Sequence, residues 1–260
     1  MLSIAIKYFL FILKSHFHRG YIRHSSFVYD LHKRVFSDKK NDDFEVLLNW
    51  RKKILLDKRK MEICSFGAGS GIKTKRPQKV GNLVNKTAVP HKYGAILYNV
   101  VREFKPHSII ELGTGFGIST AYLAAALPGS SVQTIEGSPE RSSIAKEFLH
   151  QINILNVTFI TGEFENILEN LLLKARHPLL LFIDGNHKYQ PSLNYFQIIL
   201  KYVNDDTIII FDDIHWSSEM EKAWKEIYRN EKVILSLDLF RYGMAFFRKG
   251  MTKQHVLINF

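Results

Sequence analysis

The sequence predicts an α/β protein, in which helices cover both faces of a mostly parallel sheet. From Pro90 onward, short apolar runs rich in β-branched residues alternate with segments whose apolar residues recur at helical spacing. One strand-to-helix junction carries Gly113, Gly115 and Gly117 at alternate positions. Such a turn lets a ligand approach bare backbone beside a helix N-terminus, so it is the first candidate for a binding site.

The predicted elements follow one another at regular spacing. Each strand is a short apolar run, and each helix is an amphipathic segment between turn residues. The last two strands lie only a few residues apart, which predicts a hairpin. In chain order, strands are expected at 108–112, 131–136, 157–161, 179–184, 207–212, 233–237 and 242–247, and helices at 93–104, 118–127, 139–152, 164–174, 191–202 and 219–229.

The positive charge is concentrated in the first third of the chain. Residues 1–86 contain 19 Lys or Arg against 7 Asp or Glu, whereas residues 87–260 contain 17 against 18. Residues 44–56 have helical spacing of apolar side chains, and the basic run at 51–60 is typical of a solvated helix face. We therefore expect a basic, largely helical extension at 1–86 and an α/β domain at 87–260. No nucleic-acid-binding motif is present in the extension.

Residues 2–13 form a mostly apolar stretch that predicts a helix. Twelve residues fall short of the roughly 20 that span a bilayer, and the basic residues that follow do not fit a signal-peptide cleavage site. The helix is expected to pack on the protein surface or at a homodimer interface. Peripheral contact with a membrane surface is the alternative.

The single cysteine, Cys64, excludes an intrachain disulfide and favours a reducing compartment, so we expect a cytoplasmic protein. A second glycine-rich stretch, residues 66–71, lacks a good following helix because Pro77 interrupts it. We interpret this stretch as a loop.

Four predicted strands carry acids at or near their ends: Glu111, Glu136, Asp184 and the pair Asp212-Asp213. The C-terminal ends of parallel strands share one edge, where ligands bind in open α/β sheets. Glu136 lies 23 residues after Gly113, a distance at which an acid can accept the hydroxyls of a ribose. The alternative role for Glu136 is a helix cap. Glycines with a ribose acid fit either a nicotinamide-dependent oxidoreductase or an S-adenosylmethionine-dependent methyltransferase.

Residues 92–216 resemble the class I S-adenosylmethionine-dependent methyltransferases, in particular the catechol, caffeoyl-CoA and macrocin-type O-methyltransferases. The resemblance covers about half the chain and does not reach residues 1–86. It is carried by six ordered segments: Lys92-Tyr93-Gly94, Glu111 to Thr120, Thr134 to Pro139, Thr161-Gly162-Glu163, Phe182 to His187, and Ile210 to Asp213.

By this resemblance the fold would be Rossmann-like and doubly wound, with a seven-stranded, mostly parallel sheet whose last strand is antiparallel. The glycine turn would hold the methionine part of the cofactor, Glu136 the ribose, and Gly162 with Glu163 or Phe164 the adenine. The resemblance therefore implies a cofactor-binding set of Glu111, Gly113, Gly115, Gly117, Ser119, Glu136, Gly162, Glu163, Phe164 and Asp184.

The metal-dependent relatives imply a divalent cation, such as Mg²⁺, held by Asp184, Asp212 and Asp213. Asp213 stands where those relatives have Asn, which keeps an oxygen ligand but adds negative charge. The general base of the catechol type is a Lys three residues after the first metal Asp; His187 stands at that position here, and Lys188 follows it. In the alternatives, His187 is a hydrogen-bonded loop residue, and Asp212 or Asp213 caps the helix near Ser217 or pairs with His215.

These inferences converge on a methyltransferase that transfers a methyl group to a hydroxyl of a small molecule. The alternatives are a nicotinamide-dependent oxidoreductase and a non-catalytic adaptor whose basic N-terminal region binds membrane or nucleic acid. The sequence does not name the acceptor.

Overall fold

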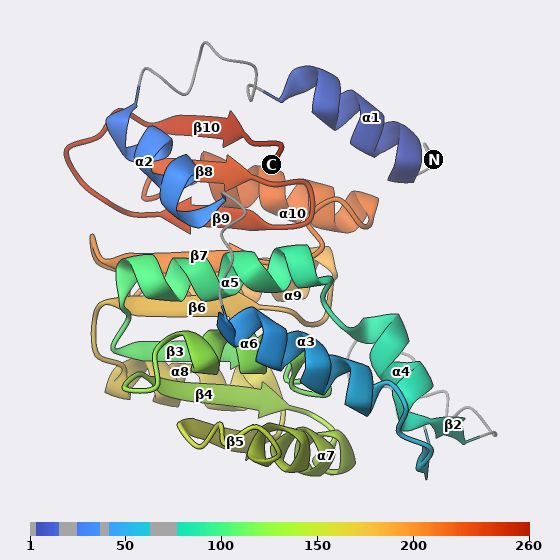
Figure 1. Cartoon of the computed structure of the whole chain (residues 1–260). Coiled ribbons are helices and arrows are strands. Elements are labelled where there is room, and N and C mark those ends of the chain that lie inside the picture. The colour runs from blue at the N-terminus through green and yellow to red at the C-terminus, as the bar shows by residue number, and fades with distance from the viewer. Residues whose placement is uncertain (1–3, 16–24, 37–41, 63–76) are drawn as a thin grey trace. The chain divides into compact units, whose positions relative to one another are not determined.

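The computed structural model describes residues 4–15, 25–36, 42–62 and 77–260 (Figure 1). The chain divides into two compact units. Unit 1 contains residues 1–37 and 168–260, and unit 2 contains residues 38–167. The division does not coincide with the boundary expected near residue 87. Cys64 and the glycine-rich stretch at 66–71 lie outside the described residues.

Unit 2 is built on three parallel strands, β3 (Ser108–Leu112), β4 (Ser131–Glu136) and β5 (Val157–Thr161), with β4 in the middle. All three have the predicted bounds. Every residue of β3 is buried, as its continuous apolar pattern predicts. The register pairs Glu111 with Thr134, and Glu136 with Thr161.

The helices of unit 2 include α5 (His91–Phe104), α6 (Ile118–Ala126) and α7 (Pro139–His150). Helix α5 packs closely on α6, because Gly94 leaves room for the Tyr122 ring: a Cβ at residue 94 would lie 2.6 Å from that ring.

The N-terminal part of unit 2 contains the predicted helix α3 (Asp42–Ile54). Its Trp50 Nε1 donates to the carbonyl of Phe148, 2.9 Å away, and its Phe44 ring packs edge-on against Tyr98 at 5.0 Å. These long-range contacts explain why α3 belongs to unit 2 rather than to a separate extension. Helix α4 (Val80–Thr87) and the short strands β1 (Lys60–Met61) and β2 (Gln78–Lys79) were not predicted.

Unit 1 contains five strands in the spatial order β10-β8-β9-β7-β6. Strands β6 (Leu179–Ile183) and β7 (Thr207–Phe211) are parallel, and β9 (Gly243–Phe246) is antiparallel to both β7 and β8 (Leu235–Asp238), which confirms the predicted hairpin. Strand β10 (Gln254–Leu257) was not predicted, and it pairs parallel with β8. It adds one strand to the seven that were predicted, three of which lie in unit 2 and four in unit 1, and β9, the last of those seven, is antiparallel as the resemblance implied.

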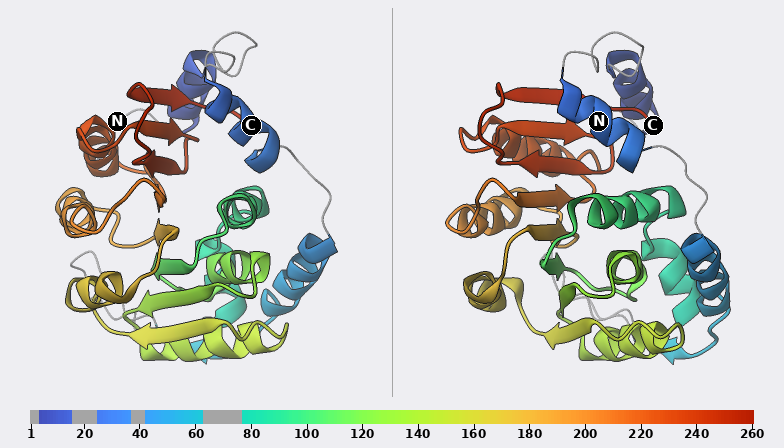
Figure 2. Two further views of the ribbon diagram at one scale, coloured as in Figure 1. Left: turned by 90° about the vertical axis from the view of Figure 1, so that its left-hand side faces the viewer. Right: turned by 60° about the vertical axis from the view of Figure 1, so that its left-hand side comes forward.

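Helices cover both faces of the strands of unit 1. Helix α10 (Ser218–Arg229) places Trp224 against Phe211 and Gly243, whereas Phe27 of α2 (Ser26–Val35) packs on Phe246. Figure 2 shows α10 and α2 on opposite sides of strands β8 to β10. The predicted helices α8 (Phe164–Lys174) and α9 (Tyr189–Ile199) are also present.

The apolar N-terminal stretch forms helix α1 (Ile4–Lys14), as predicted. The helix packs on unit 1 through Phe11, whose ring lies 5.4 Å from the ring of Phe240. Among the described residues, no helix combines the length and the apolar character needed to cross a bilayer.

Candidate functional site

The glycine turn lies between β3 and α6 in unit 2, where the sequence places it. Gly113, Gly115 and Gly117 have φ values of 101°, 54° and 80°, a region that favours glycine. The backbone N–H groups of Gly113 and Thr114 donate to the carbonyl of Ile135 at 2.9 and 3.2 Å, so the turn is tied to β4. The arrangement leaves bare backbone at the N-terminus of α6.

The three glycines differ in what surrounds them, and this difference gives a test. A Cβ on Gly117 would lie 2.6 Å from Leu149 Cδ1, whereas a Cβ on Gly115 would meet nothing within 4 Å. Gly117→Ala should lower the free energy of unfolding by about 2–3 kcal/mol, from backbone strain together with the clash. Gly115→Ala is the matched control and should cost about 1–2 kcal/mol, from backbone strain alone. Equal losses in denaturant titrations would contradict this account of Gly117.

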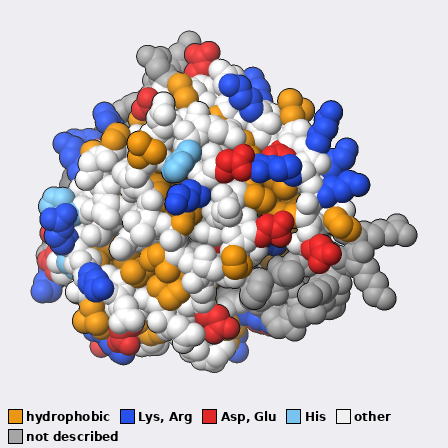
Figure 3. All heavy atoms as spheres, turned by 90° about the horizontal axis from the view of Figure 1, so that it is seen from below, with side chains coloured by type: hydrophobic (Ala, Val, Ile, Leu, Met, Phe, Trp, Pro, Cys, Tyr) orange, Lys and Arg blue, Asp and Glu red, His pale blue; other side chains and the backbone are white. Residues whose placement is uncertain are grey.

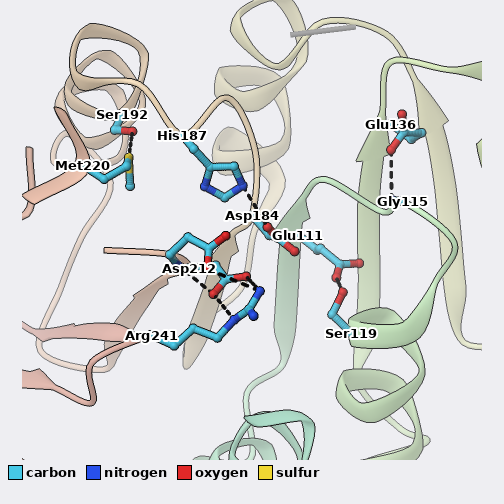
Figure 4. Close-up of polar contacts among 11 residues, drawn as sticks. Glu111, Gly115, Ser119, Glu136, Asp184, His187, Ser192, Asp212, Met220 and Arg241 are labelled. Carbon is cyan, nitrogen blue, oxygen red and sulfur yellow. Dashed lines mark hydrogen bonds and ion pairs between the residues drawn. The ribbon is translucent and has the colours of Figure 1, made fainter. Parts of the chain in front are cut away.

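Glu136 ends β4 directly beside the glycine turn. Its carboxylate accepts the backbone N–H of Gly115 at 2.9 Å and that of Ser138 at 3.0 Å (Figure 4). Its backbone carbonyl accepts the N–H of Gly162 at 3.1 Å, which fixes the end of β5 beside it. The side chain that caps α7 is Ser138, which accepts the N–H of Arg141, so the capping alternative for Glu136 is wrong. The carboxylate of Glu136, a residue that is only 6% exposed, therefore braces the glycine turn.

Glu111 belongs to β3, just before the turn, and has no exposed surface. Its carboxylate accepts hydroxyl protons from Ser119 at 2.6 Å, Thr120 at 2.6 Å and Thr134 at 2.7 Å. Burial raises the pKa of Glu111, and the three hydroxyl donors oppose that shift. Glu111 and Ser119, two of the predicted cofactor residues, are thus joined in a buried hydrogen-bond network that connects β3, β4 and α6. Thr120 and Thr134 belong to this network and were not predicted.

The three residues expected near the adenine follow β5. Gly162 has a φ of 153°, and a Cβ there would lie 2.7 Å from Ile167 Cδ1. Glu163 is exposed and accepts a hydrogen bond from Asn166 at 3.2 Å, whereas Phe164 is half-buried at the start of α8. Glu163 is thus the one of the three that is open to solvent.

A second group of predicted residues lies in unit 1, after β6 and β7. His187 Nε2 lies 3.3 Å from Asp184 Oδ1 (Figure 4). Burial and the charge of Asp212 raise the pKa of Asp184 to about 7. Burial would lower the pKa of His187, but the hydrogen bond and charge of Asp184 outweigh it and raise the pKa to about 9. Lys188 has extended backbone at the N-cap of α9.

Asp212 is fully buried, and both of its oxygens are bound by Arg241, a residue that was not predicted. Arg241 Nε and Nη2 donate to Asp212 Oδ1 and Oδ2 at 2.7 Å each, and Nη2 lies 3.5 Å from Asp213 Oδ1. Asp212 Oδ1 also accepts the backbone N–H of Asp213 at 2.7 Å. This is a bidentate guanidinium–carboxylate pair, the strongest form of such contact.

The alternative roles expected for Asp212 and Asp213, a cap on the helix near Ser217 or a pair with His215, are also wrong. Ser217 caps α10 by accepting the N–H of Met220 at 3.1 Å. His215 pairs with Asp238 at 2.8 Å and Glu221 at 3.3 Å rather than with either residue of the Asp pair.

The donor set does not fit a resident divalent cation. Three free carboxylates would suit Mg²⁺, but Asp212 already binds a guanidinium through both oxygens, and a second cation on the same carboxylate would be repelled by it. Within the part of the chain that the structure describes, no group of three or more His, Cys, Asp or Glu side chains is placed to hold a metal ion. Arg241 thus supplies, from within the chain, positive charge that the resemblance assigned to a metal.

Known proteins share both sequence and fold with this chain. A family described as a methyltransferase domain matches residues 110–214. A catechol O-methyltransferase from Niastella koreensis is 28% identical over 130 residues, which cover 49% of this chain and 58% of that protein. An uncharacterized protein of Acanthamoeba polyphaga mimivirus is 30% identical over 149 residues, covering 53% of this chain and 67% of that protein. The first of these matches therefore spans little more than half of the relative's length.

Solved structures resemble the fold over most of the chain. The O-methyltransferase from Bacillus cereus in complex with SAH has a TM-score of 0.55 at 20% identity, covering 84% of this chain and 96% of that one. The SAH-bound Podospora anserina methyltransferase PaMTH1 has a TM-score of 0.59 at 16% identity, covering 90% and 99%. At these identities the likeness shows the fold alone. Residues 110–214 therefore match a methyltransferase-domain family, the sequence relatives include a catechol O-methyltransferase, and the fold is that of methyltransferases of known structure.

Proposed function

We propose that the protein transfers a methyl group from S-adenosylmethionine to a hydroxyl of a small molecule, without a resident metal ion. The observation that carries the cofactor assignment is the glycine turn braced by Glu136 at the ends of β3 and β4. An acid at the end of the second strand is the group that accepts ribose hydroxyls in this class of fold. Glu163, Phe164 and the backbone of Gly162 are our candidates for the adenine.

Methyl transfer to a hydroxyl requires that the acceptor be aligned with the methyl group of the cofactor and that the hydroxyl lose one proton. When bound, S-adenosylmethionine supplies a methyl group that is already activated by its sulfonium. His187 is our candidate base: Nε2 bonds Asp184, which leaves Nδ1 to accept the proton that the acceptor hydroxyl loses. Asp184 orients the imidazole and stabilises its charged form. Arg241 fixes Asp212 through both carboxylate oxygens.

One face of the molecule, drawn in Figure 3, bears on the nucleic-acid part of the adaptor alternative. Lys and Arg side chains on that face are interspersed with Asp and Glu rather than gathered into one basic surface. Nucleic-acid binding without sequence preference depends on such a gathered surface. The single cysteine leaves the cytoplasm as our proposed compartment.

Cofactor binding tests the proposal directly. Glu136→Ala should weaken binding of S-adenosylhomocysteine roughly ten- to hundredfold in titration calorimetry, since about 1.5–3 kcal/mol is lost with charge-assisted hydrogen bonds. Glu140→Ala, an exposed acid on the first turn of α7, is the matched control and should bind normally. Because Glu136 also braces the turn, thermal unfolding of both variants should be measured alongside. Tight binding of NADH with none of S-adenosylhomocysteine would overturn the proposal.

A further inference from the structure

Helix α1 is apolar on two opposite faces, and only one of them is used inside the chain. Phe11 is 6% exposed and packs on Phe240 and on His215, while Tyr8 packs edge-on against Phe240 at 4.8 Å. Lys7 adds an ion pair with Glu221 at 2.9 Å. This face fixes the helix on unit 1.

The opposite face is exposed. Phe9, Leu10 and Leu13 are 61%, 38% and 67% exposed, and with Ile6 they stand at the i, i+3, i+4, i+7 positions that share one side of a helix. Six of the twelve large apolar side chains that are exposed in the described part of the chain belong to these eleven residues of α1. Single exposed apolar residues are ordinary, but a contiguous apolar face marks an interaction site.

The charge around α1 indicates which partner the face binds. Helix α1 contains Lys14 in its last turn and no Asp or Glu, Lys7 being paired with Glu221, and the sequence that follows as far as residue 29 adds two Arg and no acid. A second copy would bring the same positive charge against itself, whereas an anionic lipid surface would attract it. Eleven residues make a helix of about 16 Å, which fits along a membrane surface and does not span the core.

We propose that α1 binds the surface of a membrane that contains anionic phospholipid, with the face formed by Ile6, Phe9, Leu10 and Leu13 inserted at the headgroup boundary. An amphipathic helix binds there through its apolar area and through basic residues beside it. Of the side chains that α1 packs on, His215 lies two residues after Asp213, and Phe240 directly precedes Arg241. Binding would therefore hold these two loops of unit 1 near the lipid surface.

Flotation of the full chain with vesicles tests the proposal. The wild type should float with vesicles of phosphatidylcholine and phosphatidylserine and bind phosphatidylcholine vesicles at least tenfold more weakly. Phe9→Ser/Leu13→Ser should reduce binding to the mixed vesicles at least tenfold. Leu173→Ser, which removes an apolar side chain that is also 67% exposed, is the matched control and should bind like the wild type. Circular dichroism should show that both variants keep the wild-type fold.

A charge variant separates the two contributions. Lys14→Glu should weaken binding to the mixed vesicles several-fold and leave the weak binding to phosphatidylcholine unchanged. Failure of the wild type to float with mixed vesicles, or normal flotation of Phe9→Ser/Leu13→Ser, would overturn the proposal. So would sedimentation showing a dimer that the same double variant dissociates, because a second copy would then be the partner of this face.

Discussion

Arg241→Met should lower the free energy of unfolding by about 3–5 kcal/mol, the loss typical of removing one partner from a buried ion pair. The large effect follows from Asp212, which has no exposed surface and binds the guanidinium through both oxygens. Without Arg241 that carboxylate keeps its desolvation penalty and loses its counterion. Chemical denaturation followed by circular dichroism measures the change.

Two further variants test this reason for the loss. Arg248→Met removes an exposed arginine that lies over the Phe27 ring, and it should cost under about 1 kcal/mol. Arg241→Met/Asp212→Asn removes both charges and should recover part of the lost stability, because a neutral amide is cheaper to bury than an unpaired carboxylate. A double variant no more stable than Arg241→Met would contradict the assignment of the loss to Asp212.

The same variant tests the proposed absence of a resident metal. Mg²⁺ or Mn²⁺ should leave the melting temperature of the wild type unchanged, because Arg241 already neutralises Asp212. In Arg241→Met the freed carboxylate should bind the cation, which would raise the melting temperature with metal concentration. Stabilisation of the wild type by millimolar Mg²⁺, with loss of activity on chelation, would show that a metal and Arg241 act together.

The parts of the fold that depend on local pattern were predictable from the sequence. Strands β3, β4 and β5 begin and end where their apolar runs do, and the glycine turn lies where alternating glycines interrupt that pattern. Strand β10 and helix α4 were missed for different reasons. Strand β10 is four residues long and depends on pairing with β8, whereas α4 is eight residues long and has no side-chain cap at its start.

The candidate site likewise contains residues that the sequence could predict and one that it could not. Glu136 and Asp184 could be found because Glu136 ends β4 and Asp184 directly follows β6, and ligands bind beyond the C-terminal ends of strands in open α/β sheets. Arg241 could not be found in this way, because it lies 29 residues after Asp212 in the turn between β8 and β9. Its place is fixed only when β9 pairs antiparallel with β7. A basic residue in a hairpin turn next to an acid-rich sheet edge is the signal that could have indicated it.

His187→Ala should lower kcat by about 10²–10⁴-fold, the usual contribution of a general base, once an acceptor hydroxyl compound is in hand. The geometric reason is the 3.3 Å contact that orients the imidazole on Asp184. His150→Ala, at the exposed end of α7, is the matched control and should retain wild-type activity. Added imidazole should restore part of the rate of His187→Ala, because the space left by the side chain can admit a base of the same chemistry.

The dependence of kcat on pH tests the direction in which Asp184 shifts the pKa of His187. Since Asp184 raises the pKa of His187 to about 9, the imidazole is protonated at neutral pH, and kcat should rise from pH 7 to pH 9 as the proton is lost. Asp184→Asn removes the charge that stabilises the imidazolium, so it should lower the pKa of His187 and move the rise in rate to lower pH. A rate that is flat over this range in both enzymes, together with near-normal turnover by His187→Ala, would show that the protein acts by aligning the acceptor and that His187 carries no proton in the reaction.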